Sequence, residues 1–184
     1  IQDSDLEELK SIITTKLNLE MAATEEMVGI ALNTMPEDCC IVPEKREELT
    51  TEGGLDVAGN LEWIKRCTGQ LRDAGINVSL FIEPSQEQID ASVKAGANMI
   101  ELHTGTYANH PEDGHLLNAI TDSVGYAAGQ GLIVNAGHGL DYVNVVPIAA
   151  MRQINELNIG HSIVARSIIV GIEQAVREMK ALLE

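Results

Sequence analysis

His138 stands between two glycines, and no other short stretch of the sequence points so directly to chemistry. The apolar run 132–134 and Asn135 come just before it, in LIVNAGHGL. An imidazole titrates close to neutral pH, so it can both donate and accept a proton. Glycine costs about 0.5–1 kcal/mol relative to alanine in ordered structure. The flanking glycines therefore indicate either a turn that needs a positive φ or a backbone that approaches a ligand closely.

A second glycine–histidine pair, Gly160-His161, lies in LNIGHSIVARS near the end of the chain. Backbone N–H groups at the start of a helix point at a bound anion, and the helix dipole favours negative charge there. In a barrel of strands and helices, the loops after the last strands commonly form a phosphate site with a nearby helix N-terminus. The two glycine–histidine elements together favour binding of a phosphate or another polar substrate over two unrelated turns.

Two glutamates interrupt apolar strands. Glu20 lies in NLEMA, and Glu101 lies in MIELH with His103 two residues later. Burial beside an apolar core raises a carboxyl pKa and suits the group to proton transfer near neutral pH. The alternative is a strand-end glutamate that pairs with a cation. We expect Glu20, Glu101 and His138 to meet at one mouth of the fold as acid–base groups.

The segment VPEKREELTTEGGLDV, residues 42–57, is rich in charge and joins a predicted strand to a predicted helix. Its charges, including Lys45 and Arg46, are by themselves typical of a solvated surface. The pair Thr50 and Thr51, followed by two glycines, favours a second interpretation. In that interpretation the segment is a mobile loop that closes over a substrate.

Other site chemistries have little support. The five histidines show no H-x-H or H-E-x-x-H spacing, so we expect no metal site, and His110 and His115 lie in a polar stretch typical of the surface. The sequence contains no phosphate-loop, dinucleotide or nucleophile-elbow motif. Cys39, Cys40 and Cys67 do not suggest a disulfide framework. We expect them to be small buried hydrophobes in a protein of the reducing cytoplasm.

Composition and charge limit the class of protein. The chain has 184 residues, 45% of them hydrophobic, which is enough for one domain with a sizeable core. A formal net charge of -16 does not suit phosphate backbones or anionic membranes, so we expect no nucleic-acid and no membrane partner. An anionic small ligand must then be held by individual side chains and local dipoles.

Short apolar runs alternate with longer amphipathic segments. Most of the runs are too continuous for half-exposed strands, which is typical of parallel strands covered on both faces. They predict strands at 17–21, 39–42, 77–82, 98–102, 132–136 and 157–160.

Between the strands the sequence predicts helices. Ser4 or Asp5 would cap the first and Thr24 the second, and Ser85 would begin a later one that Gly96 ends. Further helices are expected at 55–75, 112–131, 144–151 and 167–184.

Alternating strands and helices indicate parallel βαβ units with right-handed crossovers. Two folds fit this order, an open doubly wound sheet and a (β/α) barrel of the TIM type. An open sheet gathers its polar residues at one switch point, whereas a barrel carries them near the C-terminal ends of strand after strand. Four predicted strands carry such residues: Asn18, Glu20, Glu101, His103, Asn135 and Asn158. We therefore predict a single α/β barrel domain over residues 1–184, with about six of the eight strand–helix units.

Six stretches resemble, in order, the pyridoxine 5′-phosphate synthase (PdxJ) family: NLEMA, VPEKREELTTEGGLDV, SLFIEP, IELHTGTYA, VNAGHGLDYVNV and ELNIGHSIVARSI. The resemblance runs from Ile1 to Glu184. It implies a cytoplasmic transferase of vitamin B6 biosynthesis. The family condenses 3-amino-2-oxopropyl phosphate with 1-deoxy-D-xylulose 5-phosphate into pyridoxine 5′-phosphate, phosphate and water. The resemblance also implies a (β/α) barrel, no metal or organic cofactor, and assembly into a homo-oligomer, an octamer.

The same resemblance implies roles for individual residues. Glu20 matches a proton acceptor, His138 the proton donor and Glu101 a transition-state stabiliser. Acid–base groups without a redox centre suit a condensation that needs several proton transfers. Substrate contacts are implied at four further positions: Thr50 for the deoxyxylulose phosphate, and Gly139, Gly160 and His161 for the aminoketone phosphate.

The family's pattern begins before Ile1. Its first two strand–helix units, with a further catalytic histidine and the arginines that hold phosphate, match nothing in this chain, so we expect further sequence upstream. Without those units the chain would be poorly active and prone to associate.

Two other interpretations stay open. One is a phosphosugar aldolase or isomerase, although no predicted strand carries a Schiff-base lysine. The other is a truncated, non-catalytic relative that binds phosphorylated ligands or pairs with full-length subunits.

Overall fold

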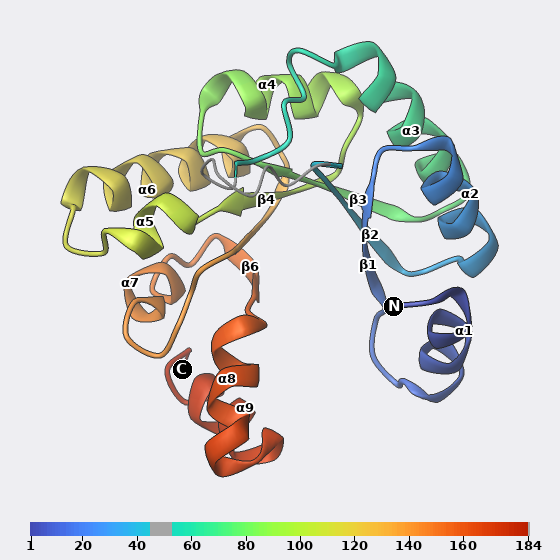
Figure 1. Ribbon diagram of the computed structural model, residues 1–184. Coiled ribbons are helices and arrows are strands. Elements are labelled where there is room, and N and C mark those ends of the chain that lie inside the picture. The colour runs from blue at the N-terminus through green and yellow to red at the C-terminus, as the bar shows by residue number, and fades with distance from the viewer. Residues whose placement is uncertain (45–52, 184) are drawn as a thin grey trace.

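Six parallel strands form one curved sheet in the computed structural model, which describes residues 1–44 and 53–183 (Figure 1). The strands lie in chain order across the sheet. They are β1 (Asn18–Ala22), β2 (Asp38–Val42), β3 (Asn77–Ile82), β4 (Met99–His103), β5 (Ile133–Gly137) and β6 (Ile154–Asn158). Helices alternate with the strands, and the result is an α/β half-barrel of the TIM type. The predicted fold class, with about six strand–helix units, is confirmed.

The helices cover one side of the sheet. In Figure 1, α2, α3, α4 and α6 follow its outer side, whereas α1 and the α8–α9 pair lie at its two ends. Within the described residues, none of the helices has the length and apolar character that crossing a membrane requires. The helices are α1 (Asp3–Ile12), α2 (Glu25–Thr34), α3 (Leu61–Asp73), α4 (Gln86–Ala95), α5 (Gly105–Asn109), α6 (Gly114–Gly129), α7 (Val145–Ala149), α8 (His161–Val170) and α9 (Ile172–Lys180).

Helix ends follow the sequence where the capping signal is strong. The Thr24 hydroxyl accepts the Met27 N–H at 3.1 Å and caps α2. The Ser85 hydroxyl accepts the Gln88 N–H at 3.3 Å and caps α4, which ends at Gly96 with a φ of 83°. These predicted boundaries are confirmed.

Two predicted helix starts are wrong. Helix α1 begins two or three residues earlier, because Gln2 is its N-cap and donates its backbone N–H to the Asp5 carboxylate at 2.7 Å. Helix α3 begins at Leu61 rather than at residue 55. Asp56 instead holds a turn by accepting the Gly59 N–H at 2.9 Å.

The C-terminal region also differs from the prediction. The expected helix 167–184 is two helices, because Gly171 takes a φ of 83° between α8 and α9. Strand β6 lies at 154–158 rather than 157–160. Three of the five residues in its sequence INELN are polar and none of the five is buried, so no continuous apolar run marks this strand. A register shift between Val134 and Asn135 accompanies its pairing with β5.

The two faces of the sheet have different chemistry, because alternate residues of a strand point to opposite sides. The helix-facing residues form the apolar core, with Ile41, Leu80, Ile100, Leu102 and Val134 all buried. The inner face carries polar residues, and its register pairs are Glu20 with Cys40, Phe81 with Glu101, and Glu101 with Asn135.

The cysteines are buried and free, as predicted. Cys39 and Cys67 belong to the apolar core. Cys40 faces the inside of the sheet, where its thiol lies 3.6 Å from Glu101 Oε2. Cys40 is therefore a neighbour of the candidate site as well as a small buried residue.

A polar network lies at the N-terminal ends of the strands. Lys16, which precedes β1, contacts Asp38 of β2 at 2.7 Å and Glu156 of β6 at 2.9 Å. Asn77 donates to Asp38, and Asn98 donates to Asn77, each at 2.9 Å. Since β1 and β6 are the edges of the sheet, Lys16 connects parts of the fold that belong to opposite edges.

Candidate active site

Glu101 lies in β4 on the inner face and is only 4% exposed. Its Oε2 accepts a hydrogen bond from Asn158 Nδ2 at 2.6 Å and a weak one from the Cys40 thiol at 3.6 Å. Burial, to which the charge of Glu20 adds, outweighs these hydrogen bonds and raises the pKa of Glu101 to about 7. Glu101 can therefore take up or release a proton near neutral pH.

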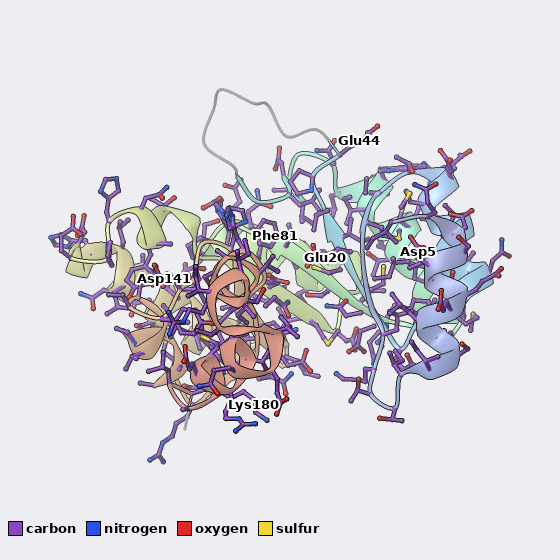
Figure 2. All side chains as sticks on the ribbon, turned by 60° about the horizontal axis from the view of Figure 1, so that its bottom comes forward. Asp5, Glu20, Glu44, Phe81, Asp141 and Lys180 are labelled. Atoms are coloured by element: carbon purple, nitrogen blue, oxygen red, sulfur yellow. The ribbon has the colours of Figure 1, made fainter. Side chains whose placement is uncertain are left out.

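Glu20 shares this inner face. Its strand register places it beside Cys40, whose thiol contacts Glu101. Glu20 is exposed, and its charge acts on both Cys40 and Glu101. Figure 2 shows Glu20 near the middle of the molecule, whereas Asp5 lies on the helix at its right side and Lys180 lies at the bottom. The structure thus brings the two predicted glutamates together, one exposed and one buried.

His138 follows β5 with a φ of 82°, and Gly139 follows it with a φ of 74°. A positive φ is uncommon for a residue other than glycine. The Thr104 hydroxyl is shared between the carbonyls of Gly137 and His138, at 2.7 and 2.6 Å, and holds this backbone in place. The turn proposed from the sequence is present, with His138 itself in the positive-φ conformation.

The two flanking glycines are needed for different reasons. A Cβ on Gly137 would lie 2.3 Å from Glu101 Oε1 and 2.8 Å from the Asn158 carbonyl, so a side chain there would displace the carboxylate. A Cβ on Gly139 would lie 2.7 Å from the Ala108 Cβ, and the positive φ adds strain. Gly137 therefore makes room for Glu101 directly beside His138.

Two other rings surround His138. The ring centroids of His138 and His103 are 5.0 Å apart, and Phe81 lies 5.1 Å from His103 and 6.3 Å from His138. His103 Nδ1 is 2.7 Å from Glu83 Oε1. His103 was predicted only as a polar residue near the end of a strand, without a role, and Glu83 was not predicted at all. The sequence does contain a signal for Glu83, because this residue directly follows a buried strand, where the site residues of barrels lie.

Glu83 is held by two donors. Burial alone would raise the pKa of Glu83, but hydrogen bonds from His103 and from the Gly54 N–H, the latter at 2.9 Å, outweigh burial and lower that pKa. Gly54 fits tightly here, since a Cβ on it would lie 2.4 Å from the Glu83 backbone nitrogen. A carboxylate therefore faces the His103 ring at neutral pH.

The second glycine–histidine element lies at the start of α8. Gly160 is the N-cap, His161 is the first helical residue, and both are exposed. The Ser162 hydroxyl donates to the Leu140 carbonyl at 2.8 Å, which attaches the first turn of α8 to the segment just after His138. The two elements are thus joined at the same end of the sheet.

Some predicted residues are not brought into this cluster. Thr50, like Lys45, Arg46 and Thr51, lies outside the described residues. His110 and His115 are exposed, as predicted. Over residues 1–44 and 53–183, the structure contains no group of three or more His, Cys, Asp and Glu side chains that could hold a metal ion.

Solved structures with little sequence identity share the fold. The YdjI aldolase from Escherichia coli K12 superposes with a TM-score of 0.58 at 11% identity, over 98% of this chain and 72% of the aldolase. D-Psicose 3-epimerase from Clostridium cellulolyticum H10 superposes with a TM-score of 0.56 at 14% identity, over 100% of this chain and 85% of the epimerase. At such low identity the likeness concerns the fold alone.

Sequence relatives are much more similar. The pyridoxine 5′-phosphate synthase of Trichlorobacter lovleyi is 56% identical over 100% of this chain and 78% of its own length. The enzyme of the same name from Pseudoalteromonas translucida is 57% identical over 100% of this chain and 76% of its own length. The family described as "Pyridoxal phosphate biosynthesis protein PdxJ" matches residues 1–184. The resemblance found in the six motifs is therefore confirmed, and the chain belongs to the PdxJ family of pyridoxal phosphate biosynthesis enzymes.

Proposed function

We propose that this chain is a pyridoxine 5′-phosphate synthase that condenses 3-amino-2-oxopropyl phosphate with 1-deoxy-D-xylulose 5-phosphate. In this proposal Glu20 accepts protons, His138 donates them, and Glu101 stabilises the charge that develops in the transition state. One observation carries the proposal. A buried Glu101 with a pKa of about 7 lies beside Glu20, and His138 follows the adjacent strand.

The chemistry needs groups of this kind. Joining an amine to a ketone releases water, and closing and aromatising the ring also releases phosphate. Each oxygen that leaves needs a proton. Protons must also be removed from nitrogen or carbon atoms of the substrates. A positioned acid or base contributes about 10²–10⁴-fold to such a step. Three acid–base groups from separate segments suit a reaction with several proton transfers better than a reaction with a single hydrolytic step.

Phosphate binding is proposed for the two glycine–histidine elements. Gly139, Gly160 and His161 would contact the phosphate of the aminoketone. A Cβ on Gly160 would meet nothing within 4 Å, so its backbone is open to a ligand at the N-terminus of the ten-residue helix α8. Thr50, assigned to the deoxyxylulose phosphate, remains a prediction.

We also propose that these phosphorylated substrates are the small-molecule partners, that neither metal nor organic cofactor is required, and that the protein is cytoplasmic.

Residues 1–184 would form a single barrel domain within a homo-oligomer, an octamer in the family. Exposed apolar side chains on α8 and α9 support self-association, namely Val164, Ile168, Ile169 and Ile172, which are 58–80% exposed.

Mixing both substrates with the protein and following the absorbance of pyridoxine phosphate tests the proposal. His138→Asn is expected to lower the rate by about 10²–10⁴-fold. His110→Asn, on an exposed histidine outside the site, is the matched control and should leave the rate unchanged. An unaltered rate in His138→Asn would remove its proposed role. Substrate binding without product in the unmodified protein would favour the non-catalytic alternative.

A further inference from the structure

One imidazole nitrogen of His103 has no hydrogen-bond partner in the part of the chain that the structure describes. Its side chain is 2% exposed, and Nδ1 faces Glu83 at 2.7 Å. Nε2 is buried and has no hydrogen-bond partner among the described residues. Buried polar atoms are nearly always paired, so an unpaired one in a candidate site calls for an explanation from function.

Glu83 determines which nitrogen carries the hydrogen. An ionised carboxylate can only accept, so the hydrogen between the two groups belongs to Nδ1 of His103. The Gly54 N–H donates to the same carboxylate oxygen at 2.9 Å and fixes its position. In the neutral ring, the other nitrogen, Nε2, is then available as an acceptor.

The ring beside Nε2 is that of His138. Their centroids are 5.0 Å apart with 54° between the planes, a separation at which facing ring nitrogens come within hydrogen-bond distance after one ring rotates. Gly105 lets the rings approach. A Cβ there would lie 2.5 Å from His103 Nε2 and 3.0 Å from His138 Cδ2.

We propose that His103 is a positioning residue for His138, with Nε2 accepting a hydrogen bond from the His138 ring while the site works. Glu83, His103 and His138 then form one chain of hydrogen bonds. This inference rests on the acid–base role proposed for His138. A third group that orients a catalytic base in this way is a recurring arrangement in enzymes.

Two substitutions at residue 103 separate positioning from packing. His103→Asn keeps a donor near the Nδ1 position, facing Glu83, but has no atom at the Nε2 position. His103→Gln places an amide oxygen near the Nε2 position. We expect His103→Asn to lower kcat by about 10–100-fold, with KM changed less than about twofold, and His103→Gln to recover most of the loss.

The second measurement does not depend on turnover. In the ¹⁵N-labelled protein, the His138 ring-nitrogen resonances should move in His103→Asn and return toward their original positions in His103→Gln. Glu83→Gln, which leaves both rings in place, should move them in the same direction as His103→Asn by a smaller amount. The matched controls are His110→Asn and Glu112→Gln, from an exposed Glu–His pair with 3.9 Å between its atoms, and neither should have an effect.

The results distinguish this inference from the proposed function. Resonances of His138 that are unmoved in His103→Asn and Glu83→Gln, or an equal loss of kcat in His103→Asn and His103→Gln, would overturn the inference even if the protein makes product. If the unmodified protein makes no product but the resonances respond as expected, the hydrogen-bonded chain stands and the proposed reaction fails.

Discussion

The protein holds β4 and α8 in very different ways. All five residues of β4 are buried, whereas none of the ten residues of α8 is. Strand β4 carries Glu101 and His103, and α8 begins with His161, one of the proposed phosphate contacts. Glu101 and His103 are therefore fixed by a close-packed core, whose side chains have little freedom. The proposed phosphate contacts lie on an element with little burial.

This difference suggests that reactivity and phosphate binding depend on separate parts of the structure. Orientation of a catalytic group needs support from packed neighbours and hydrogen bonds. Glu101 has both, from β4 itself and from Asn158. Backbone contacts at the start of a helix need only an accessible helix end. Substitutions in the two regions should therefore have effects of very different size.

The largest difference is expected from removing the same side chain in each region. Ile100 of β4 is 0% exposed and Ile168 of α8 is 80% exposed. Ile100→Ala should lower the free energy of unfolding by about 2–5 kcal/mol, because it leaves a cavity in the core. Ile168→Ala should change the unfolding free energy of the monomer by less than about 0.5 kcal/mol. Urea denaturation of both variants measures this, and similar losses would show that α8 is as well packed as β4.

The next effect concerns Glu101 and pH. Its pKa is raised from an ordinary value of 4.5 to about 7, so between these values the folded protein keeps a proton that the unfolded chain releases. The unfolding free energy, relative to Glu101→Gln, should therefore fall as the pH rises through this window. The total fall is about 3 kcal/mol at most, and it is complete above the folded-state pKa. Denaturation of both proteins from pH 4 to 8 tests this, and parallel curves would contradict it.

The smallest effect compares two glycines. Gly137→Ala, next to Glu101, should destabilise the protein by about 1–3 kcal/mol, because the new methyl group meets the carboxylate and the Asn158 carbonyl. Gly125→Ala, at an exposed position of helix α6 with open space around it, should stabilise by about 0.5–1 kcal/mol. Thermal unfolding of both variants gives the comparison, and a neutral Gly137→Ala would mean that the site adapts to a side chain there.

The sequence predicts the fold well where hydrophobic patterns are continuous. The runs that became β1 to β5 each lie within one residue of the observed strands, because buried apolar residues such as Leu19 and Met21 in β1 mark the position of each strand. Strand β6 was misplaced because INELN contains only two apolar residues and none of its five residues is buried. The break at Gly171 was missed because an isolated glycine inside a helical pattern is tolerated at a modest cost and does not by itself end a helix.

The site was predicted less completely than the fold. Glu20, Glu101 and His138 could be found because each lies in or just after an apolar run. The contact of Glu83 with His103 joins residues 20 apart in the sequence, and it depends on how two strand ends meet. Likewise, the reason for Gly137 lies in the position of the Glu101 carboxylate, which no local pattern contains.

The ion pairs of Lys16 have a consequence for the shape of the sheet. The Lys16 ammonium group, which precedes β1, contacts the carboxylates of Asp38 in β2 and Glu156 in β6 and so connects the two sides of the opening in the curved sheet. Reversing the charge at Glu156 is therefore expected to weaken the link between the two edges of the sheet.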